Sequence, residues 1–436
     1  MNYVKRALRA TGLVLLFVPA VLPSNNTNRW IPILERPESY VFQKRSHLTA
    51  SFMYTAGSTA DKRSGGKVGI PELWGKYDLK DVINSYLQVN TGLSNPVFAV
   101  TGSHALEHKS MMFKLAGKIE TVGLLLDGQY NLGWQNLWVG ARLPVMSLRN
   151  AVRYDFNQEQ SAQILSPQEK LGHTAQQLAA LSQQRADKIR RSTHDSLGFS
   201  SNQFTKNGFG DLDVYIRWHK SFDHALLART IDTALQSGVL IPTGIGMDHA
   251  IPGSIPAASD GHWGMYGDWV TGVELKQDLT VGLMLGFTHL FSHTKERRIA
   301  IGNEPTIFSA LTGRVRVDPG FSFKCSPYLE LGNLTDGLDF QARYSYFRHE
   351  DDNWRDERVD KTIKSYLQGD ESLIASKKGL TRWRAHYVSL ALRYDTAVAM
   401  EKIMFAPRFF ISYDMPMNGS AFAKVHAVQL GAELQF

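Results

Sequence analysis

Hydrophobic and polar residues alternate along many short stretches of the chain, and the clearest stretch is its last one. The positions from 428 to the end alternate strictly: Val428, Gln429, Leu430, Gly431, Ala432, Glu433, Leu434, Gln435 and Phe436. Successive side chains of an extended strand point to opposite faces, so this pattern predicts a strand with one apolar and one polar face. The strand ends on a bare aromatic residue.

The same alternation recurs in eleven earlier segments, which predicts twelve strands in all. They lie at about 48–54, 122–127, 136–143, 211–218, 231–241, 268–276, 281–288, 321–331, 338–345, 388–394, 405–414 and 424–436. Short connections fall near 131–133, 222–224, 277–278, 334–336 and 397–399, and long ones at about 57–110, 147–207, 243–262, 292–312, 350–382 and 415–423. Short and long connections alternate.

An even number of strands with short and long links in turn is typical of an up-and-down antiparallel β-barrel of the bacterial outer membrane. Such a barrel satisfies every backbone polar group internally, as lipid requires. A soluble β-sandwich also shows alternation, but it usually keeps polar residues on a water-facing side. We therefore predict an all-β fold in which residues 46–436 form a transmembrane barrel of about twelve strands. We expect the protein to be a monomer.

Aromatic residues near the predicted strand ends support a barrel in a membrane, because amphipathic rings gather at membrane interfaces. The set comprises Tyr130, Trp134, Trp138, Trp218, Trp263, Trp269, Tyr344, Tyr346, Tyr394 and Tyr413.

The N-terminus predicts an export signal. Three cations precede an apolar run at 13–18, and the small residues at 18–20 suit cleavage. We expect a signal peptide at 1–20, with residue 24 as the less favoured end, and a short periplasmic segment at 21–45. The single cysteine, Cys325, excludes an intramolecular disulfide.

Composition narrows the class further. After the N-terminus, no stretch supplies the ~20 consecutive apolar residues of a spanning helix, which excludes a helical membrane bundle. The formal net charge is +7, and removing the signal leaves about +4, too little to indicate nucleic acid as a partner. Motifs for phosphate loops or metal sites are missing from the sequence, so we expect no cofactor and no metal.

Two long loops predict helices. Ser166 and Pro167 suit a helix start, and leucines recur at helical spacing behind them, which predicts a helix at about 167–190. A second helix is predicted between Pro71 and Gln88. These helices could cover the mouth of the barrel or pack on its solvent side.

The inward faces of the predicted strands carry charges of both signs. The candidate interior residues are Arg142, Arg217, Arg343, Arg393, Arg408, Asp211, Asp213, Asp268, Glu330 and Glu433. They could line a water-filled path and set solute preference. Equally, arginine and carboxylate pairs could fill a narrow bore and hold it together.

Two loop motifs suggest chemistry. His194 and Ser196, with Asn202 nearby, are similar to the His-x-Ser-Asn-Gly motif of the outer-membrane phospholipase A family, in which histidine activates serine. Leu197 stands where that family has asparagine, so we do not expect an enzyme. The string 349–353 has clustered oxygens that calcium could use, but consecutive carboxylates favour a solvated acidic turn.

The hairpin Asn-Gly-Phe-Gly-Asp-Leu-Asp-Val-Tyr at 207–215 and Ser-Gly-Val-Leu-Ile-Pro-Thr-Gly at 237–244 resembles one shared by a broad group of Gram-negative barrels. The group includes the phenol-degradation (MetA-pathway) outer-membrane proteins and, more distantly, the long-chain fatty-acid channels, which use fourteen strands and an N-terminal plug. The last strand resembles the assembly signal of such barrels, with Leu434 and Phe436 as its key positions. This resemblance implies an outer-membrane location and the barrel-assembly machinery as a partner.

Together these features lead us to expect a porin-like barrel that passes small or hydrophobic solutes passively. The alternatives are a surface-exposed structural or adhesin-like barrel and, less favoured, a phospholipase-like esterase. The expected partners are outer-membrane lipid, the assembly machinery and an unidentified solute.

Overall fold

The computed structural model describes residues 28–31, 36, 46–90, 109–133, 136–157, 165, 170–224, 228–368, 381–396 and 407–436. The expected signal peptide, Trp134 and the turn at 397–399 lie outside these ranges. Within them, no helix is both long and apolar enough to cross a membrane.

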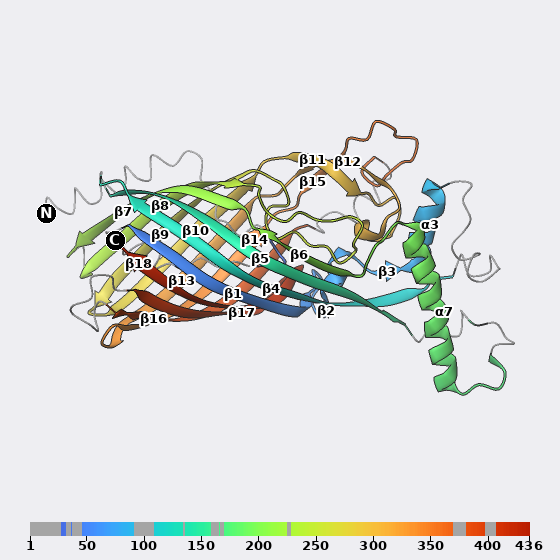
Figure 1. Ribbon diagram of the computed structural model, residues 1–436, viewed down its shortest axis with the longest axis horizontal. Helices are drawn as coiled ribbons and strands as arrows, with labels where there is room; N and C mark the ends of the chain where they lie inside the picture. The colour runs from blue at the N-terminus through green and yellow to red at the C-terminus, as the bar shows by residue number, and fades with distance from the viewer. Residues whose placement is uncertain are drawn as a thin grey trace.

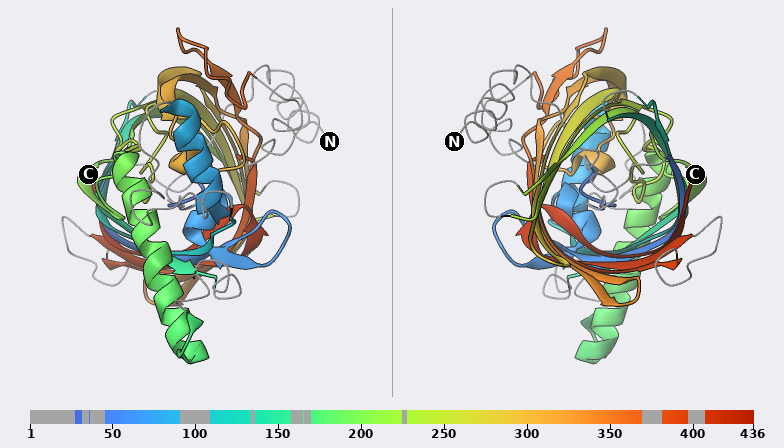
Figure 2. Two further views of the ribbon diagram at one scale, coloured as in Figure 1. Left: turned by 90° about the vertical axis from the view of Figure 1, so that its right-hand side faces the viewer. Right: turned by 90° about the vertical axis from the view of Figure 1, so that its left-hand side faces the viewer.

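Twelve strands of the described chain form one closed antiparallel ring (Figures 1 and 2). In order they are β1 (His47–Asp61), β4 (Met112–Asn131), β5 (Leu137–Phe156), β7 (Leu212–Asp223), β8 (Thr230–Ile241), β9 (Gly264–Lys276), β10 (Leu279–Leu290), β13 (Ser322–Thr335), β14 (Leu338–His349), β16 (Trp383–Asp395), β17 (Arg408–Ser420) and β18 (Phe422–Gln435). The ring closes because β1 pairs with both β4 and β18. The prediction of an all-β barrel of about twelve strands is confirmed.

In the belt region, the strands turn most of their apolar residues outward and most of their polar residues inward. On β1, Leu48 is 50% exposed on the outer face, while His47 and Thr49 are buried on the inner one. The outer face presents a belt of exposed apolar side chains that includes Phe52, Val122, Leu124, Val214, Ile216, Val239, Val281, Leu390, Leu392, Ile411 and Leu430. An apolar belt on a closed barrel with a polar interior is the construction of an outer-membrane protein.

β4 and β5 are longer than the sequence pattern predicted. Up to Val145 the apolar residues of β5 other than Trp138 and Pro144 face outward. From Met146 to Phe156 its buried apolar residues face inward, and Arg149 and Arg153 are exposed. The strand leaves the lipid belt there and packs its apolar side on interior and loop residues. The phase of the pattern reverses at this point, which is why the predicted strand stopped at 143.

The long loops build a cap over one end of the barrel, at the right of Figure 1. Its elements are β2 (Lys67–Gly69), η1 (Ile70–Trp74), β3 (Tyr77–Asp78), α3 (Leu79–Val89), α7 (Ala175–Ser196), β6 (Gln203–Phe209), η4 (Thr306–Phe308) and a sheet of β11 (His293–Arg298), β12 (Thr312–Asp318) and β15 (Asn353–Asp356). The helices α3 and α7 cross this end of the ring (Figure 2). Of the two positions left open for the helices, the structure shows the one at the mouth.

Both loop helices exist, but their starts differ from the prediction. Thr174 caps α7 in a capping box with Gln177, so the helix begins at Ala175 rather than near 167. The first loop contains a short 3-10 helix, and α3 begins only after Asp78, whose side chain accepts from the backbone N–H of Lys80. The polar sequences of β11, β12 and β15 gave no strand signal.

Four inward aromatic rings lie flat against glycines directly opposite them on the neighbouring strand. The pairs are Gly140 with Tyr215, Gly238 with Tyr266, Gly282 with Tyr328, and Gly431 with Phe410. A Cβ at any of these glycines would lie 2.1–2.5 Å from a ring carbon. Glycine thus lets the rings fold onto the wall and occupy the bore.

Replacing Gly282 with alanine is therefore expected to lower the free energy of unfolding by about 1–3 kcal/mol, the usual cost of overpacking. The new Cβ would meet Cζ of Tyr328 at 2.1 Å. The measurement is the temperature of heat-modifiable gel migration. Gly128→Ala is the matched control, because its nearest neighbour, Cδ1 of Leu48, lies at 3.7 Å. Equal shifts for both variants would contradict this packing argument.

Candidate binding site at the barrel mouth

The capped end of the barrel holds a cavity of about 120 Å³. Its walls come from segments far apart in the chain: residues 28–30, η1, the loop after β8, the ends of β10, β14 and β16, and the cap sheet. Four tryptophans line it together with polar groups of both signs: Trp30, Trp74, Trp354, Trp383, Arg29, Arg297, Asp260, Asp352, His262 and His349. Of these, only Trp74 lies in a segment for which the sequence predicted an element of the right kind.

Residues 28–31 lie within the ring at this end, where they are dark blue in Figure 2. Trp30 and Ile31 are 4% and 2% exposed, and they pack in one buried cluster with Met53 of β1 and Val425 of β18. These residues therefore occupy the bore at its capped end, which is called the upper bore below.

Hydrogen bonds hold this segment in place. The side-chain amide of Asn28 donates to the carbonyl of Pro256 at 2.7 Å, and the N–H of Ala423 donates to the carbonyl of Arg29 at 3.1 Å. Arg36 makes a further contact inside the bore: its Cζ lies 3.5 Å from the ring centroid of Phe410.

The segment 21–45 was expected to lie in the periplasm, and its described residues do not fit that expectation. Residues 28–31 pack at the opposite, capped end because their apolar side chains complete a cluster that the wall alone leaves open. The other residues of 21–45, apart from Arg36, lie outside the described ranges. The division of the chain at residue 20 or 24 stays a prediction.

Stacked rings form the apolar part of the cavity wall. Trp30 and Trp74 stack with centroids 5.4 Å apart, and the guanidinium of Arg29 lies 4.6 Å and 5.1 Å from their centroids. Across the cavity, His349 stacks on Trp383 at 5.9 Å. A flat molecule between such faces would gain stacking and cation–π contacts.

Fixed charges form the polar part of the wall. Asp260 forms ion pairs with Lys295 and Arg297, each at 2.5 Å. Burial alone would favour its neutral acid, but the two cations outweigh burial and lower the pKa of Asp260 to about 2. Asp352 lies 2.9 Å from Nε2 of His349. The cavity thus offers both donors and acceptors to a polar group on a bound molecule.

Below the cavity, nine of the ten predicted interior charges face the bore, and most are buried. Arg142 of β5 lies between Asp127 of β4 and Asp213 of β7, at 3.4 Å and 3.8 Å. Arg217 donates to the side-chain carbonyls of Gln129 and Gln236. Arg142 and Gln236 are each bonded from a neighbouring strand, whereas the contact from Arg217 to Gln129 reaches across β5, so these contacts connect the strands of the wall.

Two further ion pairs reach across an intervening strand. Lys324 of β13 lies 3.2 Å from Asp268 of β9, above Gly286 of β10, which pairs with both residues and has no side chain to separate them. Arg343 of β14 and Asp414 of β17 lie 3.6 Å apart. Lys324 was not among the predicted interior charges, although it occupies an inward position of its strand.

Near the short-turn end, two arginines each hold two carboxylates. Arg393 lies 2.9 Å from Glu330 and 2.5 Å from Asp339. Arg408 lies 2.5 Å from Asp395 and 3.7 Å from Glu433. Like the inward aromatic rings, these pairs lie on the inner face of the wall. The two roles left open for these charges, lining a path and holding the bore together, both stay predictions.

Asp211 is the exception among the predicted interior residues. Its carboxylate accepts from the backbone N–H groups of Gly244 and Ser259, at 3.1 Å and 2.9 Å. The hydroxyl of Thr243 donates to the carbonyl of Gly210 at 2.8 Å. The Gly-x-Gly-Asp and Pro-Thr-Gly pieces of the hairpin motif therefore lock the joint between β6 and β7.

His194 and Ser196 do not form a nucleophile pair. His194 is buried in the core of the cap, where Nε2 lies 2.8 Å from the hydroxyl of Tyr77 and the ring stacks on Phe308. Ser196 is exposed and donates to the carbonyl of Ser192. Two residues apart on a helix, the side chains point in different directions.

The acidic string 349–353 has no metal-like geometry. Glu350 and Asp351 form ion pairs with Arg382, while Asp352 bonds His349. Within the described residues, no group of three histidine, cysteine or acidic side chains is placed to hold a metal ion.

One of the aromatic residues expected at the membrane interface lies elsewhere: Trp138 is buried in the bore against His219.

Histidine burial makes the cap sensitive to acid. Burial, followed by the charges of Arg190 and Arg298, lowers the pKa of His194 to about 3, and burial is also the main cause that lowers the pKa of His249 and His262 to about 4. An unfolded histidine binds a proton below about pH 6.5, whereas these three stay neutral until about pH 4 or lower. The histidines therefore destabilise the cap progressively as the pH falls from 6.5 toward 4.

The expected result is faster hydrogen exchange of α7 amides at pH 4.5 than at pH 7.5, after correction for intrinsic rates. Each histidine contributes at most about 1.4 kcal/mol per pH unit within this window. Equal protection at both values would contradict the expectation, and His194→Gln should reduce the pH dependence.

No protein-family model matches the sequence, and no curated protein is similar to it. Among solved structures, the COG4313 outer membrane channel from Pseudomonas putida F1 is 10% identical, with 92% of this chain and 100% of that chain covered and a TM-score of 0.47. A Pseudomonas aeruginosa FadL homologue is 10% identical, with 96% and 100% covered and a TM-score of 0.31. The P. putida toluene transporter TodX is 10% identical, with 91% of each chain covered and a TM-score of 0.32.

These structures belong to the broad group of barrels that the hairpin at 207–244 resembles. The fold rests on the strand pairing of the chain itself.

Proposed function

We propose that this protein passes small aromatic molecules carrying a polar group across the outer membrane, and that the tryptophan-lined cavity at its mouth receives them. The observation that carries the proposal is the cavity: it combines the stacked rings of Trp30, Trp74 and Trp383 with fixed charges of both signs. Its volume of about 120 Å³ is similar to cavities of about 150 Å³ that accept benzene.

The location of the cavity supports passage rather than mere adhesion. It lies between the cap and the bore, and Trp30 serves both, as a wall of the cavity and as part of the buried cluster that fills the upper bore. A molecule bound in the cavity therefore touches the segment that must move before anything can pass. The proposal therefore includes movement of residues 28–31 during passage.

The proposal includes two partners besides the solute. Leu434 is exposed on the outer face of the last strand, and Phe436 is 64% exposed beside the first strand, with its N–H bonded to the carbonyl of Ser46 at 2.9 Å. An exposed aromatic residue at the seam where the ring closes suits recognition by the barrel-assembly machinery. Outer-membrane lipid covers the apolar belt.

Binding of benzyl alcohol to detergent-purified protein tests the cavity. The double variant Trp74→Ala, Trp383→Ala removes a ring from each side and is expected to weaken binding about tenfold or more, because stacking is worth ~0.5–1.5 kcal/mol per ring pair beyond burial. Trp269→Ala is the control, since this tryptophan is 41% exposed on the outer wall. Equal binding by all three proteins would overturn the assignment of the cavity.

A structural barrel without transport is the second candidate, favoured by the ion pairs and rings on the inner face of the wall. It differs in one respect: a structural barrel bearing this cavity would bind the aromatic molecule without passing it.

A further inference from the structure

On the outer wall of β14 and β16, the side chains change from aromatic to cationic toward the capped end. This order is the one expected across a membrane surface, from hydrocarbon to headgroups. Tyr344 pairs with Val388, Tyr346 with His386, and Arg348 with Arg384, in register. These side chains face outward, since the residues between them, such as Phe347 and Ala385, are buried inside. The two arginines lie at the capped end.

Aromatic residues fix the depth of this site. The hydroxyl of Tyr344 lies 2.5 Å from Nδ1 of His386, and Tyr346 packs against the same imidazole at 5.0 Å. Such amphipathic rings settle at the boundary between hydrocarbon and headgroups. A strand rises about 3.3 Å per residue, so the next outward pair, Arg348 and Arg384, lies roughly 7 Å farther out, among the headgroups.

Two cations directly opposite each other on one face of a sheet repel. Glu350 offsets part of this repulsion, with Oε1 2.6 Å from Nη2 of Arg348, but it also serves Arg382. Arg384 has no carboxylate within ion-pair distance in the part of the chain that the structure describes. The facing pair therefore has an excess of positive charge.

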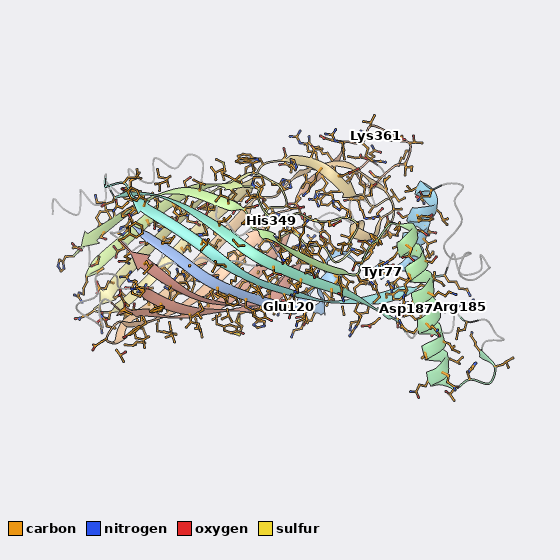
Figure 3. All side chains as sticks on the ribbon, viewed as in Figure 1. Tyr77, Glu120, Arg185, Asp187, His349 and Lys361 are labelled. Carbon is orange, nitrogen blue, oxygen red and sulfur yellow. The ribbon has the colours of Figure 1, made fainter. Side chains whose placement is uncertain are left out.

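On the outer wall of β4 and β5, the facing charges have opposite signs. There Glu120 stands directly opposite Arg149, and it also bonds Lys118. Figure 3 shows Glu120 on the outer edge of the barrel, toward the capped end. Opposite signs alternate on that wall, so it needs no external anion.

We propose that Arg348 and Arg384 bind a phosphate group of a phosphorylated glycolipid in the outer leaflet, of the lipid A type. Guanidinium groups bind phosphate oxygens through paired, charge-assisted hydrogen bonds. The site faces lipid rather than the bore, and its aromatic neighbours contact the acyl region, which favours a lipid headgroup over free phosphate. The lipid fills the space between the two cations and stabilises this part of the wall.

The test is the rise in unfolding temperature when detergent-purified protein is titrated with diphosphorylated lipid A, since a ligand of the folded state stabilises it. The variant Arg348→Gln, Arg384→Gln is expected to lower the apparent affinity at least about tenfold, the usual effect of losing a charged hydrogen bond. Arg348→Lys, Arg384→Lys should recover part of it. Arg153→Gln, an exposed arginine on the β5 extension beside Asp155, should bind like the wild type.

Unchanged affinity of the double glutamine variant, or equal binding of dephosphorylated lipid A, would overturn the proposal. A rise of the same size with inorganic phosphate alone would overturn the choice of a lipid. Heat-modifiable migration verifies that each variant folds. If the double variant does not fold, Arg384→Gln alone decides, because this arginine has no ion-pair partner in the described chain to lose.

Discussion

Replacing Lys324 with methionine is expected to destabilise the barrel by about 3–5 kcal/mol, the largest loss of any single substitution in the wall. Lys324 and Asp268 are 4% and 3% exposed, and they lie 3.2 Å apart across β10. Methionine has a similar length and no charge, so the carboxylate of Asp268 would lose its cation without gaining water. The measurement is the midpoint of unfolding in urea in the presence of lipid vesicles.

A double variant separates charge from packing. Lys324→Met with Asp268→Leu removes both charges and is expected to recover most of the loss, because a buried ion pair often contributes little more than apolar residues of equal size. Arg153→Met, whose side chain is 77% exposed, should leave the midpoint nearly unchanged. A double variant as unstable as the single one would contradict the role given to the charge of Asp268.

Replacing Trp30 with alanine is expected to open the upper bore and raise single-channel conductance in planar bilayers. Trp30 is 4% exposed, stacks on Trp74 and packs with Met53 and Val425. Truncating a buried tryptophan costs about 3–5 kcal/mol in a well-packed site. Here most of that loss falls on the attachment of residues 28–31 rather than on the barrel, whose strands pair independently of them.

The outer-wall variant Trp269→Ala again serves as the control, because its indole faces lipid and donates to the hydroxyl of Thr233. Conductance of the Trp30 variant no higher than that of the wild type would contradict the view that this segment closes the path. A fall in barrel stability as large as for Lys324→Met would show that Trp30 supports the wall instead.

The barrel was predictable from the sequence because its cause is periodic. Lipid outside and a polar bore inside impose alternation on every strand, and all twelve strands gave this signal. The interior charges followed from the same period, and nine of the ten lie in the bore. Asp211 did not, because it comes before β7 and serves the joint with the Pro-Thr-Gly turn.

The mouth was not predictable, because its parts come from separate loops with no shared period. Trp354 and Trp383 lie in or beside polar segments, and Trp30 stands in a segment that was expected outside the barrel. Only tertiary packing brings these rings together. The glycines opposite aromatic rings were visible as residues, but their role needs the strand register, which a one-residue error would reverse.

The central claim is that the barrel passes aromatic molecules through its mouth, and influx into proteoliposomes tests it most directly. The probe is 4-nitrobenzoate, a coloured anion that crosses protein-free lipid slowly. We expect saturable influx with wild-type protein, faster influx with Trp30→Ala, and loss of saturation with Trp74→Ala, Trp383→Ala. Influx into wild-type proteoliposomes equal to that into protein-free liposomes would contradict the claim and leave a structural barrel.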